Sequence, residues 1–592
     1  MSPARRLLLV RAGLSLLVAA SLIVVVVLVV GGEKSEPRYP LKERGEDLGS
    51  LGGVVGRAPA VARDVTFERL LKARSEPENW LTYYGAYDGQ RYSPLDQINR
   101  RNVKKLRPAW VFQFGQFGIQ ASEGTYSFEA APIVVDGVMY VSGWDGWLWA
   151  IDAKTGKRLW RYKHEIPIDT PLCCGNVNRG VAVAKGKVFM TTPNAHLVAV
   201  DAETGKRVWR RVFGDVRAGE SATMAPVVVK NLVIVGNSGA EYGVLGHIDA
   251  FDLDSGRRVW RRYNIPRPGQ PGSETWPKKQ RAWERGGGTA WITGTYDPEL
   301  DLMYWGTGNP SPDFDGSVRP GANLYTSSVV AIDPDDGKMR WYYQWTPHDL
   351  WDYDGNGENI LFDAGGRKLL AHFDKNGYLF ILDRTNGKLV RVTPFAERLT
   401  WGTIGRDGKV DVKKIPTRKG TDICPGPGGG KEWTHAAYNP RTRLLYAPVI
   451  ESCANFRVVP TKYKEGLPYH GGEASTHRDH WGYVKAFDPM TGKEVWRWRN
   501  DKPMLASVLT TGGDLVFAGE PTGEFNAYDA RTGKRLWTHQ TGSGLHSSPT
   551  TYSVDGKQYI AVPAGWGGWV KGFAPGALGV PRGDALIVYA LP

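Results

Sequence analysis

The chain has 592 residues, of which 41% are hydrophobic, so it can bury a large core. Its net charge is +14, but its 75 lysines and arginines are spread through turn sequences without a basic stripe, which argues against a nucleic-acid-binding protein. The high counts of glycine (73) and tryptophan (23) fit an all-β architecture with many turns.

An uncharged segment follows three arginines at the N-terminus. Arg5, Arg6 and Arg11 precede residues 12–30, which are long enough to cross a bilayer as a helix. Val29-Val-Gly-Gly32 is a poor match to a cleavage site, so residues 1–32 are predicted to be a membrane anchor in preference to a cleaved signal. The arginines place the remainder outside the cytoplasm, on the periplasmic side, and polar residues 33–63 are typical of a linker.

Four cysteines agree with export, since an even number in an exported chain suggests two disulfides. Pairing Cys424 with Cys453 closes a modest loop and leaves the adjacent Cys173 and Cys174. Consecutive Cα atoms are only about 3.8 Å apart, so a bond between neighbours would be strained. By themselves these two residues are better explained as reduced, buried thiols. No Cys-x-x-Cys-His motif occurs, so haem c is not attached to this chain.

A repeat organises the chain from residue 80 onward, within a predicted domain of residues 64–592. The segment Ala150-Ile-Asp-Ala-Lys-Thr-Gly-Lys-Arg-Leu-Trp160 recurs at Ala199–Trp209, Ala250–Trp260, Ala331–Trp341, Ala486–Trp496 and Ala527–Trp537, with a degenerate copy that has Arg391 in place of tryptophan. In each copy glycine follows aspartate by four residues, which predicts strand, turn and strand. A period of about 40–50 residues with several strands indicates a β-propeller. A β-solenoid or two sandwiches are alternatives, but a flat tryptophan at a fixed point favours docking between blades.

The tryptophan positions predict eight blades. Leu106-Arg-Pro-Ala-Trp110 lacks a preceding strand, and the final strand, residues 584–591, lacks a following tryptophan. Joining the two would complete one blade from both ends of the propeller and remove the sheet edges. Long insertions, including residues 115–126, 268–285 and 460–481, are expected to shape the mouth of a central site.

Four side chains offer oxygen donors for a hard cation: Glu241, Asn309, Asp352 and Asp354. An isolated Asp or Glu is usually a solvated turn residue, and Asn309-Pro alone is typical of a turn. Their joint occurrence with the repeat is what favours a metal site.

The order and spacing of several motifs resemble one family across residues 64–592. The motifs are Asn79-Trp-Leu-Thr, Arg91-Tyr-Ser-Pro-Leu, Cys173-Cys-Gly-Asn-Val-Asn-Arg-Gly, Gly236-Asn-Ser-Gly-Ala-Glu-Tyr-Gly, Gly286-Gly-Gly-Thr-Ala-Trp, Arg319-Pro-Gly-Ala-Asn-Leu-Tyr and Leu382-Asp-Arg-Thr-Asn-Gly. The chain is therefore similar to pyrroloquinoline quinone-dependent alcohol dehydrogenases. The resemblance implies an eight-bladed propeller with the quinone at its centre.

The resemblance also implies residue roles. Trp291 would lie under the planar quinone and a Cys173–Cys174 disulfide above it, although a lone tryptophan is more often a core residue. Polar contacts to the quinone would come from Glu129, Arg179, Thr192, Ser238, Gly239, Ala240, Thr289 and Lys375. Lys375 would donate to the reactive carbonyl.

The same resemblance makes Glu241, Asn309 and Asp352 metal ligands and Asp352 also the catalytic base. Asp354 resembles the lanthanide-dependent branch of the family, because a trivalent ion gains more from an extra carboxylate than a divalent ion does. Calcium is the alternative, with Asp354 then only capping the turn into Gly355. Two departures from the family are Glu432, where asparagine is common, and Leu245, where arginine is frequent.

These features predict oxidation of a small primary alcohol to an aldehyde. The electrons would pass to a cytochrome c or a membrane quinone, and a homodimer is compatible with the sequence. A sugar or polyol dehydrogenase is the alternative among enzymes. The other class is a non-enzymatic exported propeller that acts as an assembly scaffold, but such a scaffold has no need for the four metal-donor residues or adjacent cysteines.

Overall fold

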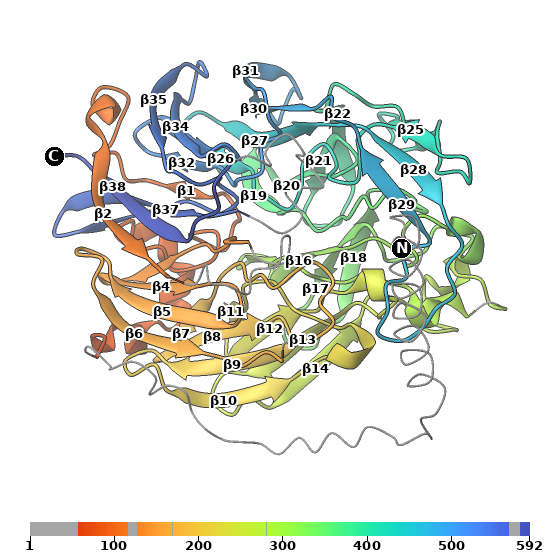
Figure 1. Cartoon of the computed structure of the whole chain (residues 1–592), viewed down its shortest axis with the longest axis horizontal. Coiled ribbons are helices and arrows are strands. Elements are labelled where there is room, and N and C mark those ends of the chain that lie inside the picture. Colours follow the sequence, from red (N-terminus) through yellow and green to blue (C-terminus); the bar gives the residue numbers. More distant parts are fainter. Residues whose placement is uncertain (1–56, 116–126, 168–169, 280, 567–579) are drawn as a thin grey trace, which may run out of the picture. The chain divides into compact units, whose positions relative to one another are not determined.

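The computed structural model describes residues 57–115, 127–167, 170–279, 281–566 and 580–592, and these are almost entirely β-strand and turn (Figure 1). Within them the one α-helix is α2 (Phe67–Leu71). Short 3-10 helices are η2 (Ala60–Asp64), η3 (Ala73–Ser75), η4 (Val103–Lys105), η5 (Val216–Ala218), η6 (Ala240–Tyr242), η7 (Ser273–Thr275), η8 (Ala282–Arg285) and η9 (Gly316–Val318). No helix in these ranges is long and apolar enough to span a membrane. The predicted anchor, residues 1–32, lies outside the described residues.

Five antiparallel sheets of four strands follow one another along the first part of the chain. They are β3–β6 (Ile133–Val135, Val138–Ser142, Trp147–Asp152, Arg158–Lys163), β7–β10 (Ala182–Ala184, Lys187–Thr192, His196–Asp201, Arg207–Val212), β11–β14 (Val227–Val229, Leu232–Gly236, His247–Asp252, Arg258–Tyr263), β15–β18 (Thr295–Asp297, Leu302–Thr307, Ser328–Ile332, Met339–Gln344) and β19–β22 (Ile360–Ala364, Arg367–Phe373, Tyr378–Asp383, Leu389–Pro394).

Three further sheets combine strands from different parts of the chain. They are β26-β27-β30-β31 (Ala437–Asn439, Leu444–Glu451, Trp481–Phe487, Glu494–Asn500), β32–β35 (Leu509–Thr511, Leu515–Gly519, Glu524–Asp529, Arg535–Gln540) with β1 (Tyr92–Ser93) on the edge, and β2-β38-β37-β36 (Arg107–Gln113, Ala585–Ala590, Lys557–Ala564, Thr550–Val554). Small sheets β23-β24 (Gly402–Ile404, Val410–Val412) and β25-β28-β29 (Thr421–Ile423, Ala454–Val458, Gly472–Thr476) form in the long insertion.

The repeat forms the predicted strand, turn and strand. In the copy at β5–β6, Asp152 Oδ1 accepts hydrogen bonds from the amides of Lys154 (3.0 Å) and Thr155 (2.8 Å). Gly156 closes the turn by donating its amide to the Asp152 carbonyl at 2.9 Å, with a φ of 76°. The side-chain oxygen of aspartate and the left-handed conformation of glycine thus explain why these two residues recur four positions apart.

Six tryptophans of the repeat pack on the turn glycine of the next sheet. A Cβ built on that glycine would lie only 2.5–2.9 Å from the indole. The pairs are Trp110–Gly156, Trp160–Gly205, Trp209–Gly256, Trp260–Gly337, Trp341–Gly387 and Trp496–Gly533. In the degenerate copy Arg391 and Thr393 pack on Gly492 instead. The prediction that tryptophan docks between neighbouring sheets is confirmed, since any side chain at the glycine would displace the ring.

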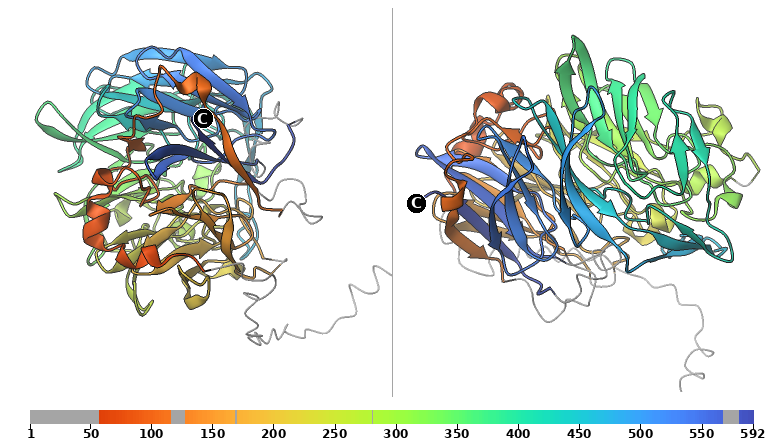
Figure 2. Two further views of the ribbon diagram at one scale, coloured as in Figure 1. Left: turned by 90° about the vertical axis from the view of Figure 1, so that its left-hand side faces the viewer. Right: turned by 90° about the horizontal axis from the view of Figure 1, so that it is seen from above.

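The two ends of the repeat region share one sheet, as predicted. Strand β2 pairs antiparallel with β38, with Trp110 opposite Val588, and both views show the orange β2 beside the dark blue β38 (Figures 1 and 2). Trp537 of the preceding sheet donates its indole N–H to the Leu106 carbonyl, at 3.1 Å, just before β2. Trp537 thus contacts the segment that leads into β2.

Burial differs along each sheet. In the sheet β3–β6 the first two strands are completely buried, whereas the fourth strand alternates between buried and partly exposed residues. Strands that are buried on both faces pack between neighbouring sheets, and this accounts for their continuous apolar sequences. Residues 58–63, within the predicted linker, also contact the sheets: Ala58 donates its amide to the Glu203 carbonyl (2.9 Å), and the Ala62 carbonyl accepts the Gly186 amide (2.8 Å).

Candidate active site

The candidate site is assembled from equivalent positions of many sheets. Glu129, Arg179, Trp291, Asp354 and Glu432 precede the first strands β3, β7, β15, β19 and β26, respectively. The second strands β12, β16 and β20 return antiparallel to the first, so the residues that follow them lie at the same end of the sheets. These are Ser238 and Glu241, Asn309, and Lys375. The repeated topology explains how residues up to 300 positions apart meet.

Asp352 and Asp354 project from one side of a tight loop. Their neighbours Trp351 and Tyr353 are both fully buried in the core beside Trp401. The carboxylate of Asp349 accepts the amides of Trp351 and Tyr353, each at 2.9 Å, and so fixes the loop. Because alternate residues face the core, the intervening aspartates face the other way. Asp352 adopts a φ of 66°, a strained conformation for a residue with a side chain.

Lys375 lies between the two aspartates. Its Nζ is 3.1 Å from Asp352 Oδ2, 3.1 Å from Asp354 Oδ2 and 3.5 Å from Glu432 Oε1. Asp354 Oδ1 also accepts the indole N–H of Trp291 at 3.1 Å and the amide of Asn309 at 3.0 Å. Asp354 therefore connects three residues that the sequence had assigned to the site. Asp354 can come this close to Asn309 because residue 308 is glycine: a Cβ there would lie 2.5 Å from Asp354 Oδ1.

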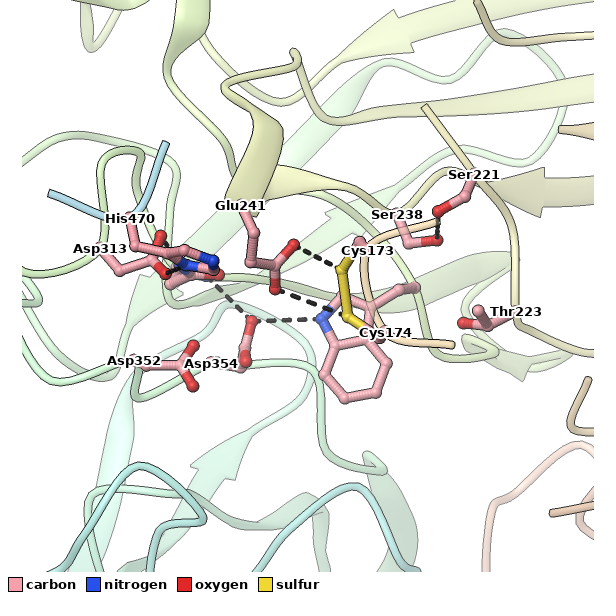
Figure 3. Close-up of a disulfide and its surroundings, with 12 residues drawn as sticks. Cys173, Cys174, Ser221, Thr223, Ser238, Glu241, Asp313, Asp352, Asp354 and His470 are labelled. Carbon is pink, nitrogen blue, oxygen red and sulfur yellow. Dashed lines mark hydrogen bonds and ion pairs between the residues drawn. A yellow bond between two sulfur atoms is a disulfide. The ribbon is translucent and has the colours of Figure 1, made fainter. Parts of the chain in front are cut away.

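Glu241 faces the disulfide between Cys173 and Cys174, which the structure contains together with a Cys424–Cys453 disulfide (Figure 3). Its Oε2 lies 2.8 Å from Cys173 Sγ, and Figure 3 shows Asp352 and Asp354 below it. Among the described residues, Cys173, Cys174 and Glu241 are the only group of His, Cys and carboxylate side chains whose ligand atoms all lie within 4.8 Å of one another. Disulfide sulfurs are not thiolates, so Glu241 is the member suited to a hard cation.

Asn309 is connected by hydrogen bonds to Asp313 and, through it, to His470, two residues that the sequence did not identify. Its Nδ2 donates to Asp313 Oδ1 at 2.9 Å, and Asp313 Oδ2 lies 2.9 Å from His470 Nδ1. The backbone of the neighbouring Tyr469 donates its amide to the Glu241 carbonyl at 2.6 Å. No motif marks this contact, because His470 lies 157 positions from Asp313 in an insertion.

Arg179 forms a second group with Glu129. Its Nη2 lies 2.9 Å from Glu129 Oε2, and its Nη1 donates to Thr223 Oγ1. The guanidinium carbon also lies 4.9 Å from the ring centre of Trp291 and 4.6 Å from that of Trp433. Thr223 and Trp433 were missed in the sequence. Thr223 precedes β11 as Arg179 precedes β7, so equivalent positions in the repeat could have identified it.

The remaining predicted residues are Ser238, Gly239, Ala240, Thr289 and Thr192. Ser238 is buried, with its Oγ 2.9 Å from Ser221 Oγ; Gly239 (φ 113°) and the buried Ala240 connect it to Glu241. Thr289 is 1% exposed, and its hydroxyl has no hydrogen-bond partner among the described residues. The hydroxyl of Thr192 bonds to Asn194 at 2.7 Å within the β8–β9 turn.

Burial controls the electrostatics of the site. It raises the pKa of Glu241 to about 7, with Asp313 adding to the effect, and raises the pKa of Asp352 well above its usual range despite Lys375. Burial lowers the pKa of Lys375, but Asp352, Asp354 and Glu432 outweigh it and raise the pKa overall. Burial also raises the pKa of Glu129 to about 7, although Arg179 opposes this. Burial and neighbouring carboxylates thus oppose ionisation of Glu241 and Asp352, and a bound cation would favour their ionised forms.

The arrangement fits both groups that the resemblance implied. Glu241, Asp352 and Asp354 are hard oxygen donors whose charges act on one another, and Asn309 is bonded to Asp354, so the donor types suit a Ca²⁺ or lanthanide ion. The flat ring of Trp291, the Cys173–Cys174 disulfide and the hydroxyl of Thr289, which has no hydrogen-bond partner among the described residues, suit a planar molecule with polar substituents.

Comparison with known proteins agrees with this chemistry. Residues 80–401 and 499–560 match the family described as glucose/ethanol/alcohol dehydrogenase, beta-propeller domain. The chain is 39% identical over 547 residues to the quinoprotein alcohol dehydrogenase PedH of Pseudomonas putida, covering 87% of this chain and 90% of PedH. It is 38% identical to the lanthanide-dependent methanol dehydrogenase of Methylacidiphilum fumariolicum, covering 90% of this chain and 92% of that protein. A solved europium-containing methanol dehydrogenase superposes with a TM-score of 0.82 at 36% identity, covering 88% of this chain and all of that one.

Proposed function

This chain belongs to the pyrroloquinoline quinone-dependent alcohol dehydrogenases, and from that premise we propose that it oxidises small primary alcohols to aldehydes with a lanthanide ion beside the quinone. As a quinoprotein alcohol dehydrogenase it is an oxidoreductase that acts on CH–OH groups, not a scaffold. Relatives named for methanol, ethanol and 1-butanol support a small alcohol as substrate. The family description also includes glucose, which keeps a sugar or polyol as the second candidate.

The proposed cation ligands are Glu241, Asn309, Asp352 and Asp354. The quinone would lie between Trp291 and the Cys173–Cys174 disulfide. Its polar groups would be held by Glu129, Arg179, Thr223, Ser238, Gly239, Ala240, Thr289 and Lys375. Thr223 replaces Thr192 in this set, because Thr223 contacts Arg179 whereas Thr192 bonds within its own turn.

When bound, pyrroloquinoline quinone supplies a two-electron acceptor and the cation supplies a Lewis acid. Asp352 would accept the hydroxyl proton of the alcohol at its carboxylate. Its side chain is 20% exposed and that of Asp354 is 6% exposed, so Asp352 is the carboxylate that a substrate can reach. The charge of Lys375, 3.1 Å away, favours the ionised, proton-accepting form of Asp352 and holds its orientation.

The observation that carries the proposal is a surplus of carboxylates: Lys375 contacts Asp352, Asp354 and Glu432, and the charge of Glu241 also acts on Asp352. With the charge of Lys375 offset by that of Glu432, Glu241, Asp352 and Asp354 leave three negative charges when ionised, and a trivalent ion would balance them. A divalent ion would leave one excess negative charge in a site partly shielded from water, which is unfavourable.

The test is reconstitution of the protein with the quinone and either calcium or lanthanum, followed by a screen of alcohols, aldehydes and sugars with a dye acceptor. We expect quinone binding only when a metal is present, and turnover of primary alcohols with light lanthanides and little with calcium. Equal turnover with both metals would contradict the lanthanide proposal, and turnover of sugars alone would contradict the small-alcohol proposal.

We further propose that the eight sheets close into an eight-bladed propeller. The support is the six tryptophan–glycine contacts, the contact of Arg391 and Thr393 with Gly492, and the return from Trp537 to Leu106. Disrupting one contact with Gly205→Val should lower the thermal stability of the whole domain in one cooperative transition. A separate transition for part of the domain would contradict closure.

We also propose export and anchoring through residues 1–32, a linker within residues 33–63, and transfer of electrons to a cytochrome c or a membrane quinone. The sequence of residues 12–30 is the support for the anchor. A reporter fused after residue 63 should be exported and should stay in the membrane fraction after a high-salt wash. Release of a chain that lacks about the first thirty residues would support a cleaved signal instead.

A further inference from the structure

The side chains of Asp313 and His470 form a chain that ends on Asn309. Asp313 is 3% exposed, and each of its carboxylate oxygens has one partner: Asn309 Nδ2 at 2.9 Å and His470 Nδ1 at 2.9 Å (Figure 3). Asp313 is outside the cation ligands proposed above. A buried carboxylate with no direct role and two defined partners is expected to orient one of them.

The hydrogen bonds fix which end of the Asn309 amide faces Asp313. The carboxylate can only accept, so the NH₂ group must point toward it, and a weaker contact of Nδ2 to the Pro310 carbonyl at 3.5 Å lies on the same side. The amide oxygen is thereby directed away from Asp313. A cation binds an amide through its oxygen, so this orientation is the one that a ligand needs.

Asp313 is itself held rigidly. The buried Arg319 donates Nη2 to the Asp313 carbonyl and Nε to the Pro312 carbonyl, both at 2.9 Å. His470 is tied to the same segment twice, because its carbonyl also accepts the Phe314 amide at 2.9 Å. Replacing the imidazole would therefore leave the backbone contact in place, and the effect of the side chain can be measured separately.

The segment that carries His470 also contacts the opposite ligand. Tyr469 donates its amide to the Glu241 carbonyl, and the ring of Tyr469 lies against Gly243. Residues 469 and 470 thus connect the loop of Glu241 to the loop of Asn309, two loops that come from different sheets.

We propose that Asp313 and His470 are positioning residues that hold the Asn309 amide with its oxygen toward the cation. The proposal rests on the proposed function, in which Asn309 is a ligand. Asp313 orients the amide directly, and His470 orients Asp313 by donating to its second oxygen. Neither residue touches the reacting alcohol in this scheme.

The experiment measures cation binding without turnover, by titrating the full-length protein with Tb³⁺ and following tryptophan-sensitised luminescence. Asp313→Ala should weaken Tb³⁺ binding about 10–100-fold, the usual effect of removing a group that orients a metal ligand. Asp313→Asn keeps an acceptor for the Asn309 amide and should stay within about threefold of the parent by the same reasoning.

His470→Ala should weaken binding less than Asp313→Ala, and His470→Gln, which keeps a donor, should restore it. Asp315→Asn is the matched control, because Asp315 is a buried carboxylate of the same segment that bonds to Ser317.

A double variant separates orientation from simple charge attraction. If Asp313 acts through Asn309, then Asn309→Ala/Asp313→Ala should bind no more weakly than Asn309→Ala alone. Additive losses, or an Asp313→Asn variant as weak as Asp313→Ala, would overturn the positioning role. If Asn309→Ala itself leaves Tb³⁺ binding unchanged, the ligand set of the proposed function fails, and that outcome is distinct from failure of Asp313 alone. The KM for alcohol at saturating cation should be unchanged in Asp313→Ala, whereas a collapsed site would raise it.

Discussion

Two parts of the site bury charge in different ways. On the cofactor side, the carboxylate of Glu129 faces the guanidinium of Arg179 at 2.9 Å, and both side chains are 5–6% exposed. On the cation side, Asp352, Asp354 and Glu432 share the single ammonium of Lys375, and the charge of Glu241 also acts on Asp352. A buried pair neutralises itself, but a surplus of carboxylates is costly until another positive charge joins it. The imbalance therefore supports the proposed cation site, and the balanced pair supports the proposed cofactor side.

The largest effect is expected from Asp352→Ala on the cation side. The change removes the more exposed of the two loop aspartates, the proposed base, so kcat should fall about 100–10,000-fold, as for loss of a general base. Circular dichroism and the melting temperature should stay near those of the parent. Asp411→Asn, an exposed acid on β24, is the control and should keep full activity. A kcat within tenfold of the parent would rule out Asp352 as the base.

On the cofactor side, Glu129 should make stability depend on pH. Burial raises its folded-state pKa to about 7, above the value near 4.5 in an unfolded chain, so the folded protein holds the proton more tightly. Its contribution is complete below about pH 4.5 and is lost as the pH rises through 7. The stability advantage of the parent over Glu129→Gln should shrink by at most about 3 kcal/mol across this window, measured by denaturant titration. A constant difference would show that Glu129 stays ionised.

Asp354→Ala tests the excess negative charge directly. Removing one of three carboxylates should lower lanthanide-supported kcat/KM about 10–100-fold, because the trivalent ion loses a ligand and its charge balance. Calcium binding should be retained, so the ratio of lanthanum to calcium activity should fall. Equal losses with both ions would indicate that Asp354 only maintains the loop and the contacts to Trp291 and Asn309.

Arg179→Lys should have the smallest effect and should be confined to the cofactor side. Lysine cannot bond to both Glu129 and Thr223 while stacking between Trp291 and Trp433. Quinone affinity should therefore drop about tenfold, measured by quenching of tryptophan fluorescence, with cation affinity unchanged. A parallel loss of cation affinity would show that the two sides are not independent.

Much of the fold could be predicted because its signals are local. The aspartate and glycine of the repeat act within one turn, and the tryptophan at a fixed distance packs on the next copy of the same turn. The alternation Trp351-Asp352-Tyr353-Asp354 likewise directs both carboxylates away from the core. Such features depend on residues a few positions apart, so a single sequence reveals them.

Contacts between distant segments were decided only by the tertiary structure. Thr192 and Thr223 both lie near β-strand ends, and only the folded chain shows that the first bonds within its own turn while the second meets Arg179. His470 reaches Asp313 from an insertion whose sequence has no repeat to set its position. The sequence by itself determined the repeat, the sheets and the carboxylates of the loop, because periodic burial and turn chemistry are encoded locally. Which polar side chains meet at the centre depended on long-range packing, where a hydrogen bond forms only after many blades have fixed its two ends.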